Sequence, residues 1–181
     1  MSKLNYITGF VLLSYILSGC HKEVVQKVED FGVVINEIMP ANSDVVADQN
    51  GEYDDWVELY NKLDTIVDIS GYYLTDSKND LSKWKFPSGT TILPDSFLIV
   101  WADNDTLQQG TPLNVYGLHA NYKLSSGGET VIFLNPEMIE LDRVKYDSID
   151  VQNSFARIPD GTGEFSWQEF PTFNGKNVQN Q

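Results

Sequence analysis

Residues 54–61 read Asp-Asp-Trp-Val-Glu-Leu-Tyr-Asn, an alternation of side chains as long as one β-strand. Because successive side chains of a strand point to opposite faces of its sheet, Val57 and Leu59 share one face. The opposite face carries Trp56, Glu58 and Tyr60. The run therefore predicts a strand with two different faces, closed by a turn residue.

Other apolar runs recur through the chain, separated by clusters of Pro, Gly, Asn, Asp and Ser. Short strands at this spacing, with no long helical run between them, are typical of an antiparallel β-sandwich. The predicted strands cover residues 33–38, 54–61, 68–76, 84–86, 96–102, 129–134, 141–146 and 154–158. The best helical window, residues 103–109, is short. The predicted fold class is therefore all-β, and we expect the space between its two sheets to contain Val57, Leu59, Leu98, Val100, Val131 and Phe133.

The composition fits one globular domain with additional segments. Of the 181 residues, 41% are hydrophobic and 12% are aromatic, which is enough apolar material for a single core. The formal net charge of -14 at pH 7 repels phosphate backbones, whereas nucleic-acid binders display a Lys and Arg face. Nucleic acid is therefore disfavoured as a partner, while a cation or a basic protein surface is compatible with the charge.

The N-terminal segment has the layout of an export signal. Residues 1–19 carry one charge, Lys3, followed by an apolar run shorter than a typical membrane span. The run ends in Leu17-Ser18-Gly19-Cys20, which resembles a bacterial lipobox, and Cys20 is the only cysteine. We therefore expect a lipoprotein signal peptide over 1–19, a lipidated Cys20 that attaches the protein to a membrane, and a tether over 20–30. The expected location is outside the cytoplasm, on the periplasmic or cell-surface face. The alternative is an uncleaved hydrophobic anchor with an incidental cysteine.

A series of short motifs follows in order along the rest of the chain. They are Ile35-Asn36-Glu37-Ile38, Asp55-Trp56-Val57-Glu58-Leu59-Tyr60-Asn61, Asp68-Ile69-Ser70-Gly71-Tyr72, Trp84-Lys85-Phe86-Pro87, His119-Ala120-Asn121-Tyr122-Lys123-Leu124-Ser125, and Ser154-Phe155-Ala156-Arg157-Ile158-Pro159-Asp160-Gly161. Together they resemble the lamin tail domain of the bacterial extracytoplasmic type. The resemblance implies a small immunoglobulin-like β-sandwich over residues 31–178. Because fold does not fix function, it implies a binding module without naming a ligand.

Catalysis by a nucleophile needs a Ser or Cys beside a base that a third group holds in place. His119 is the only histidine in the expected domain, and no Gly-x-Ser-x-Gly elbow accompanies it. We therefore expect His119 to be structural and the protein to have no catalytic residue. The alternatives are a hydrolase that depends on carboxylates or a metal, which requires convergent acids in a deep pocket, and a purely structural envelope component.

Oxygen-bearing side chains alternate around a glycine in the loop before residue 55. Asp48, Asn50, Glu52 and Asp54 are ligands of the kind that calcium prefers, because calcium takes six to eight oxygens. The spacing differs from that of an EF-hand, and an ordinary solvated acidic loop is the favoured alternative. No cofactor is required by any motif, so calcium is the one ion that the sequence suggests.

Aromatic residues gather around the first predicted strands. Trp56, Tyr60 and Trp84, with Tyr72 and Tyr73 nearby, are candidates for an exposed surface that stacks on sugars or anchors a protein. The favoured alternative is that these rings belong to the core, as most aromatic residues of a small sandwich do. The sequence thus predicts a lipid-anchored cell-envelope protein whose domain is a non-catalytic binding module for an envelope protein or a glycan.

Overall fold

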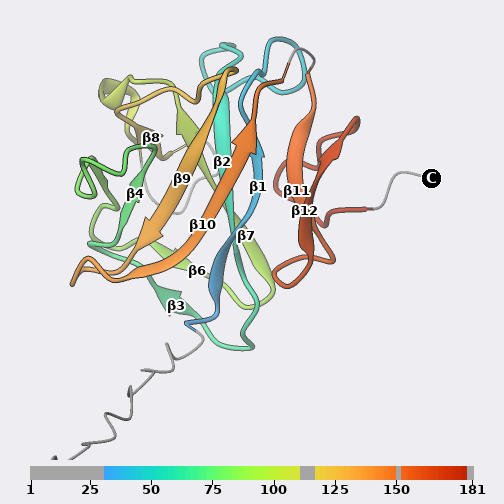
Figure 1. Ribbon diagram of the computed structural model, residues 1–181. Coiled ribbons are helices and arrows are strands. Elements are labelled where there is room, and N and C mark those ends of the chain that lie inside the picture. The colour runs from blue at the N-terminus through green and yellow to red at the C-terminus, as the bar shows by residue number, and fades with distance from the viewer. Residues whose placement is uncertain (1–30, 111–116, 150–151, 179–181) are drawn as a thin grey trace, which may run out of the picture.

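The computed structural model describes residues 31–110, 117–149 and 152–178 (Figure 1). The predicted signal peptide, the lipidated Cys20 and the tether over 20–30 lie outside the described residues. Within the described part of the chain, no helix has the length and apolar character needed to cross a membrane.

The described chain is built from twelve strands and one short 3-10 helix. In order these are β1 (Val33–Met39), β2 (Asp55–Asn61), β3 (Val67–Asp68), β4 (Tyr73–Thr75), β5 (Trp84–Lys85), β6 (Thr91–Ile92), β7 (Ser96–Ala102), η1 (Thr106–Gln108), β8 (His119–Ala120), β9 (Gly128–Leu134), β10 (Glu140–Asp147), β11 (Ser154–Ile158) and β12 (Glu164–Gln168).

The strands form a sandwich of two main sheets. The larger sheet has the order β12-β11-β1-β2-β7-β8, the smaller has the order β10-β9-β4-β5, and β3 pairs with β6 in a third, two-stranded sheet. All pairings are antiparallel except that of β7 with β8. In Figure 1, β9 and β10 lie in front of the larger sheet. The predicted all-β sandwich of immunoglobulin-like type is therefore confirmed.

The main core lies between the two large sheets. Every residue predicted for this space is buried there, namely Val57, Leu59, Leu98, Val100, Val131 and Phe133. Side chains of one face of β2 and β7 meet those of β4, β9 and β10 across the sandwich. The alternation of residues 54–61 thus gave the correct inner face of β2.

The predicted strand over 68–76 is wrong as a single element. Residues 67–68 form β3 and residues 73–75 form β4, and the two strands belong to different sheets. Gly71 between them has a φ of 80°, a left-handed backbone that turns the chain and that glycine adopts without strain. The helical window 103–109 forms only η1, whose first turn is capped by the Asp105 side chain.

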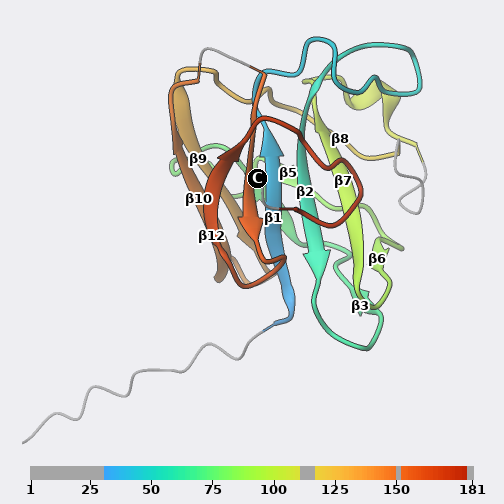
Figure 2. The same cartoon turned by 90° about the vertical axis from the view of Figure 1, so that its right-hand side faces the viewer.

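The outer face of the larger sheet is covered by the chain's own C-terminal segment, residues 169–178. Figure 2 shows this dark red segment crossing in front of β2. Phe173 packs on Trp56 and on Trp101, with ring centroids 5.4 Å apart in both pairs. Both faces of β2 are therefore buried, and the second face forms a separate small core with Met39, Trp56, Ile99 and Trp101.

Candidate functional site

The loop between β1 and β2 and the short helix η1 lie at the same end of the sandwich (Figures 1 and 2). The Gln108 side chain of η1 links them, because its Nε2 donates to Glu52 Oε2 at 2.9 Å. Within the loop, Asp48 Oδ1 accepts the backbone N–H groups of Asn50 and Glu52 at 2.8 and 2.9 Å. These bonds curl the loop so that acids separated in sequence approach one another.

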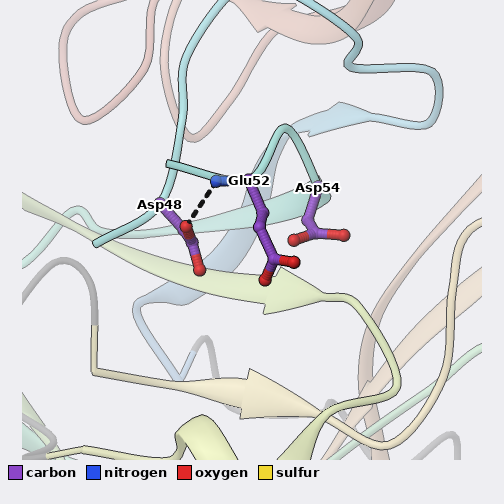
Figure 3. Close-up of side chains that lie close together, drawn as sticks. All are labelled: Asp48, Glu52 and Asp54. Carbon is purple, nitrogen blue, oxygen red and sulfur yellow. Dashed lines mark hydrogen bonds between the residues drawn. The ribbon is translucent and has the colours of Figure 1, made fainter. Parts of the chain in front are cut away.

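Three of the four predicted metal ligands come together in this loop. One carboxylate oxygen each from Asp48, Glu52 and Asp54 lies within 4.8 Å of the others (Figure 3). Asp48 is buried, Asp54 is half-buried and Glu52 is exposed. Asn50 differs from the prediction, because its side-chain amide donates to Gln108 Oε1 and so links the loop to η1.

The acids at this end hold excess negative charge. Burial raises the pKa of Asp54, and the charge of Asp103 raises it further, whereas the nearby Lys123 lowers it. Lys123 Nζ is 3.7 Å from Asp54 Oδ1. Burial also raises the pKa of the next residue, Asp55, to about 7. An added positive charge would therefore stabilise the ionised carboxylates of this cluster.

His119 is fully buried between this loop and β7. Its Nδ1 is 2.5 Å from Asp103 Oδ2, and its Nε2 is 3.0 Å from the Gln49 amide nitrogen. In the tautomer with the proton on Nδ1, the ring donates to Asp103 and accepts from Gln49. The ring thereby joins β8 to the acidic loop.

A second group of acids lies on the outer face of the larger sheet and was missed from the sequence. Glu37 and Glu58 are register partners on β1 and β2, and both are fully buried. Burial raises the pKa of each, and the charge of Glu37 further raises that of Glu58. Glu58 Oε1 accepts from the Asn36 amide at 3.1 Å. Glu37 accepts from the backbone N–H and the hydroxyl of Thr172 at 3.1 and 2.9 Å.

A β-bulge creates this second group, and the sequence contains a signal for it. The register of β1 against β2 shifts between Ile35 and Glu37, so that Asn36 is the extra residue. Ile35 and Ile38 both point into the main core. In a regular strand, two residues that are three positions apart point to opposite faces, so this strand is not regular here. Two isoleucines at this spacing around a polar pair therefore indicate a bulge that turns Asn36 and Glu37 outward.

The predicted exposed aromatic surface of Trp56, Tyr60 and Trp84 is wrong. The exposed fractions of these residues are 0%, 8% and 6%. Trp84 packs on Phe86 in the main core, with ring centroids 4.6 Å apart, whereas Trp56 lies beneath Phe173 in the outer core. Trp84 therefore belongs to the main core, Trp56 belongs to the outer core that the C-terminal segment covers, and Tyr60 is buried against the Phe97 ring.

Two of the exposed apolar side chains lie at the acidic end, while others are spread over the rest of the described surface. Leu107 on η1 is 96% exposed, and Tyr53, between Glu52 and Asp54, is about half exposed at 48%. Two surface hollows elsewhere among the described residues have no carboxylate in their walls. Acids and apolar groups are thus combined on the loop and η1.

The two-sheet architecture defines the described chain as an immunoglobulin-like β-sandwich domain. The family model for the Lamin Tail Domain matches residues 30–148, which include all strands from β1 to β10. The chain belongs to the lamin tail domain family. A comparison with curated proteins found no match.

Proposed function

We propose that this protein is a lipid-anchored component of the cell envelope whose lamin tail domain is a non-catalytic interaction module. The observation that carries the proposal is the end of the sandwich formed by the β1–β2 loop and η1. There, exposed Tyr53 and Leu107 stand beside the acids Glu52, Asp54 and Asp105. We call these five residues the acidic end surface.

The chemistry of the acidic end surface favours a protein partner with basic and apolar side chains. Interfaces commonly combine aromatic or aliphatic anchors with charges that complement those of the partner. The acids supply negative charge in a chain of formal charge -14, and Tyr53 and Leu107 supply apolar area. A glycan is less favoured, because Trp56, Tyr60 and Trp84, the rings expected to stack on sugars, are buried.

Site-specific photo-cross-linking on the full-length chain in intact cells tests this surface. A photoreactive residue replaces Leu107, and the matched control replaces Ile139, an exposed residue in the turn between β9 and β10. We expect one discrete protein adduct from position 107, weakened by added salt because the contact is electrostatic. Equal adducts at both positions, or none at 107, contradict the assignment of the acidic end surface. A purely structural component is the outcome in which neither position gives an adduct.

The lipid anchor is proposed on the lipobox-like Leu17-Ser18-Gly19-Cys20 and on the single cysteine. Two or three acyl chains, each methylene contributing about 0.8 kcal/mol, hold a protein on a membrane without a spanning helix. We expect Cys20→Ala to abolish acyl labelling and to leave the precursor unprocessed. Labelling and processing equal to those of the parent chain refute the anchor while leaving the interaction surface untested by this experiment.

A further inference from the structure

We propose that Asp48, Glu52 and Asp54 bind a divalent cation, and that calcium is the preferred ion. Each residue offers a carboxylate oxygen, and the three oxygens lie within 4.8 Å of one another. Oxygen ligands lie roughly 2.3–2.6 Å from calcium, so two ligands of one ion are at most about 5 Å apart. The three carboxylates therefore fit within the coordination sphere of a single calcium ion.

A buried oxygen of Asp48 points to the same ligand independently. Asp48 is only 6% exposed, and its Oδ1 accepts two backbone N–H groups of the loop. Its Oδ2 is buried and has no hydrogen-bond partner. In Figure 3 this second oxygen lies on the side of the Glu52 carboxylate. Buried carboxylate oxygens are normally satisfied, and a cation beside Oδ2 would satisfy this one.

The neighbouring lysine also supplies too little positive charge to neutralise the three carboxylates of the cluster. Lys123 contacts Asp54 across 3.7 Å, but the lysine side chain is 63% exposed, so water screens the pair. Asp103, which adds negative charge near Asp54, is already engaged with His119. One lysine at this distance leaves most of the charge of three carboxylates uncompensated.

The donor set favours calcium over magnesium. Calcium accepts irregular sets of six to eight oxygens, including backbone carbonyls and water, whereas magnesium demands a near-octahedral arrangement. Three carboxylates of different burial on one loop give an irregular set. Extracellular calcium modules with weak sites have Kd values on the order of 10⁻⁴ to 10⁻³ M, and we expect this range. The inference does not depend on the acidic end surface having a partner.

Calorimetric titration and thermal unfolding of the purified full-length chain in detergent test the site. The chain is titrated with calcium chloride, and melts are compared in calcium, in magnesium and in chelator at matched ionic strength. With about 10 mM calcium, occupancy of the native state should raise Tm by roughly 3–10 °C over the chelator melt. Magnesium should give a clearly smaller shift.

Single-charge variants separate binding from general electrostatics. Glu52→Gln and Asp54→Asn should each weaken calcium binding at least tenfold and remove most of the Tm shift. Asp54→Asn should also raise Tm in chelator, because it relieves repulsion among the acids. The matched control is Asp64→Asn, an exposed acid in the loop after β2, which should keep the full calcium response.

Three results overturn the proposal. The first is no heat of binding together with identical melts in calcium and chelator. The second is a full calcium response in both Glu52→Gln and Asp54→Asn, which would place the ion elsewhere. The third is a magnesium shift as large as that of calcium, which would refute the choice of ion. Both variants change exposed or half-buried acids, so the folded protein is retained for comparison.

Discussion

Two groups of acids in this domain face the same electrostatic problem in different surroundings. Asp48, Glu52 and Asp54 lie on an end loop, where at least one carboxylate meets water. Glu37 and Glu58 lie beneath the C-terminal segment, where both are fully buried. Each group contains a buried carboxylate oxygen without a hydrogen-bond partner of standard geometry, Asp48 Oδ2 in the first and Glu58 Oε2 in the second.

We expect the two groups of acids to be neutralised in different ways, because one is covered by the C-terminal segment and the other is open to solvent. Beneath the C-terminal segment the burial of Glu58 raises its pKa well above the ordinary 4.5, so a proton is the natural counter-charge. On the loop an ion from solution has access, and the carboxylates are spaced for one cation. The same residue type is thus expected to bind a proton at one site and calcium at the other.

The largest expected effect comes from replacing Leu59, which follows Glu58 in β2 and points to the opposite face of the strand. Leu59 is fully buried in the main core, so Leu59→Ala should lower the free energy of unfolding by about 2–5 kcal/mol. The loss should be the same at low and neutral pH, because leucine does not titrate. Urea unfolding at several pH values measures it. A loss below ~0.5 kcal/mol, the scale of surface substitutions, would contradict the inner face assigned to β2.

Glu58→Gln should have a smaller effect that depends on pH. Since the pKa of Glu58 in the folded state lies above the unfolded value of 4.5, protonation stabilises the folded state. That stabilisation is complete below pH 4.5 and is lost as the pH rises through the folded-state pKa. The variant keeps the Oε1 acceptor for Asn36 and carries no charge. At pH 8 the parent must bury a charge or take up a proton at this position, whereas the variant does neither. The variant should therefore be more stable than the parent at pH 8 by about 1–3 kcal/mol, the scale of the desolvation penalty of a buried polar group, which is larger when the group is charged.

The control for Glu58→Gln is Glu164→Gln on the exposed edge strand β12. This variant should follow the parent's unfolding free energy at every pH. If Glu58→Gln does the same, Glu58 is ionised at no cost and the contrast between the two groups of acids is lost.

Sequence reasoning reached the inner face of β2 because a single strand's alternation is local information. It also predicted that Asp48, Glu52 and Asp54 lie together, since their spacing in one loop is local as well. It failed where contacts with segments far away in the sequence determine whether a side chain is exposed or already hydrogen-bonded. Trp56 looked available on the outer face, but Phe173, more than a hundred positions later, covers it. Asn50 has the right side chain and spacing, yet Gln108 of η1 engages it.

The smallest expected effect comes from replacing Asp95, an exposed acid that contacts the Tyr60 side chain of β2. The Tyr60 hydroxyl donates to Asp95, and this bond is the largest cause that raises the pKa of Tyr60 to about 12. The same bond, followed by that from Lys176, lowers the pKa of Asp95. The Asp95 side chain is exposed, so its carboxylate stays ionised in contact with water. In Asp95→Asn the pKa of Tyr60 should fall toward the ordinary 10.0, while the fold and the pH dependence due to Glu58 stay unchanged.

Because the chain has nine tyrosines, a site-resolved carbon NMR titration is needed to follow the Tyr60 ring. The parent's Tyr60 should remain protonated at pH values where the variant's ring is already losing its proton, and Asp64→Asn should behave like the parent. If the parent's Tyr60 titrates together with the exposed tyrosines, its hydroxyl does not donate to Asp95. The contrast between a protonated Glu58 and an ionised Asp95 would then lose its support at Asp95.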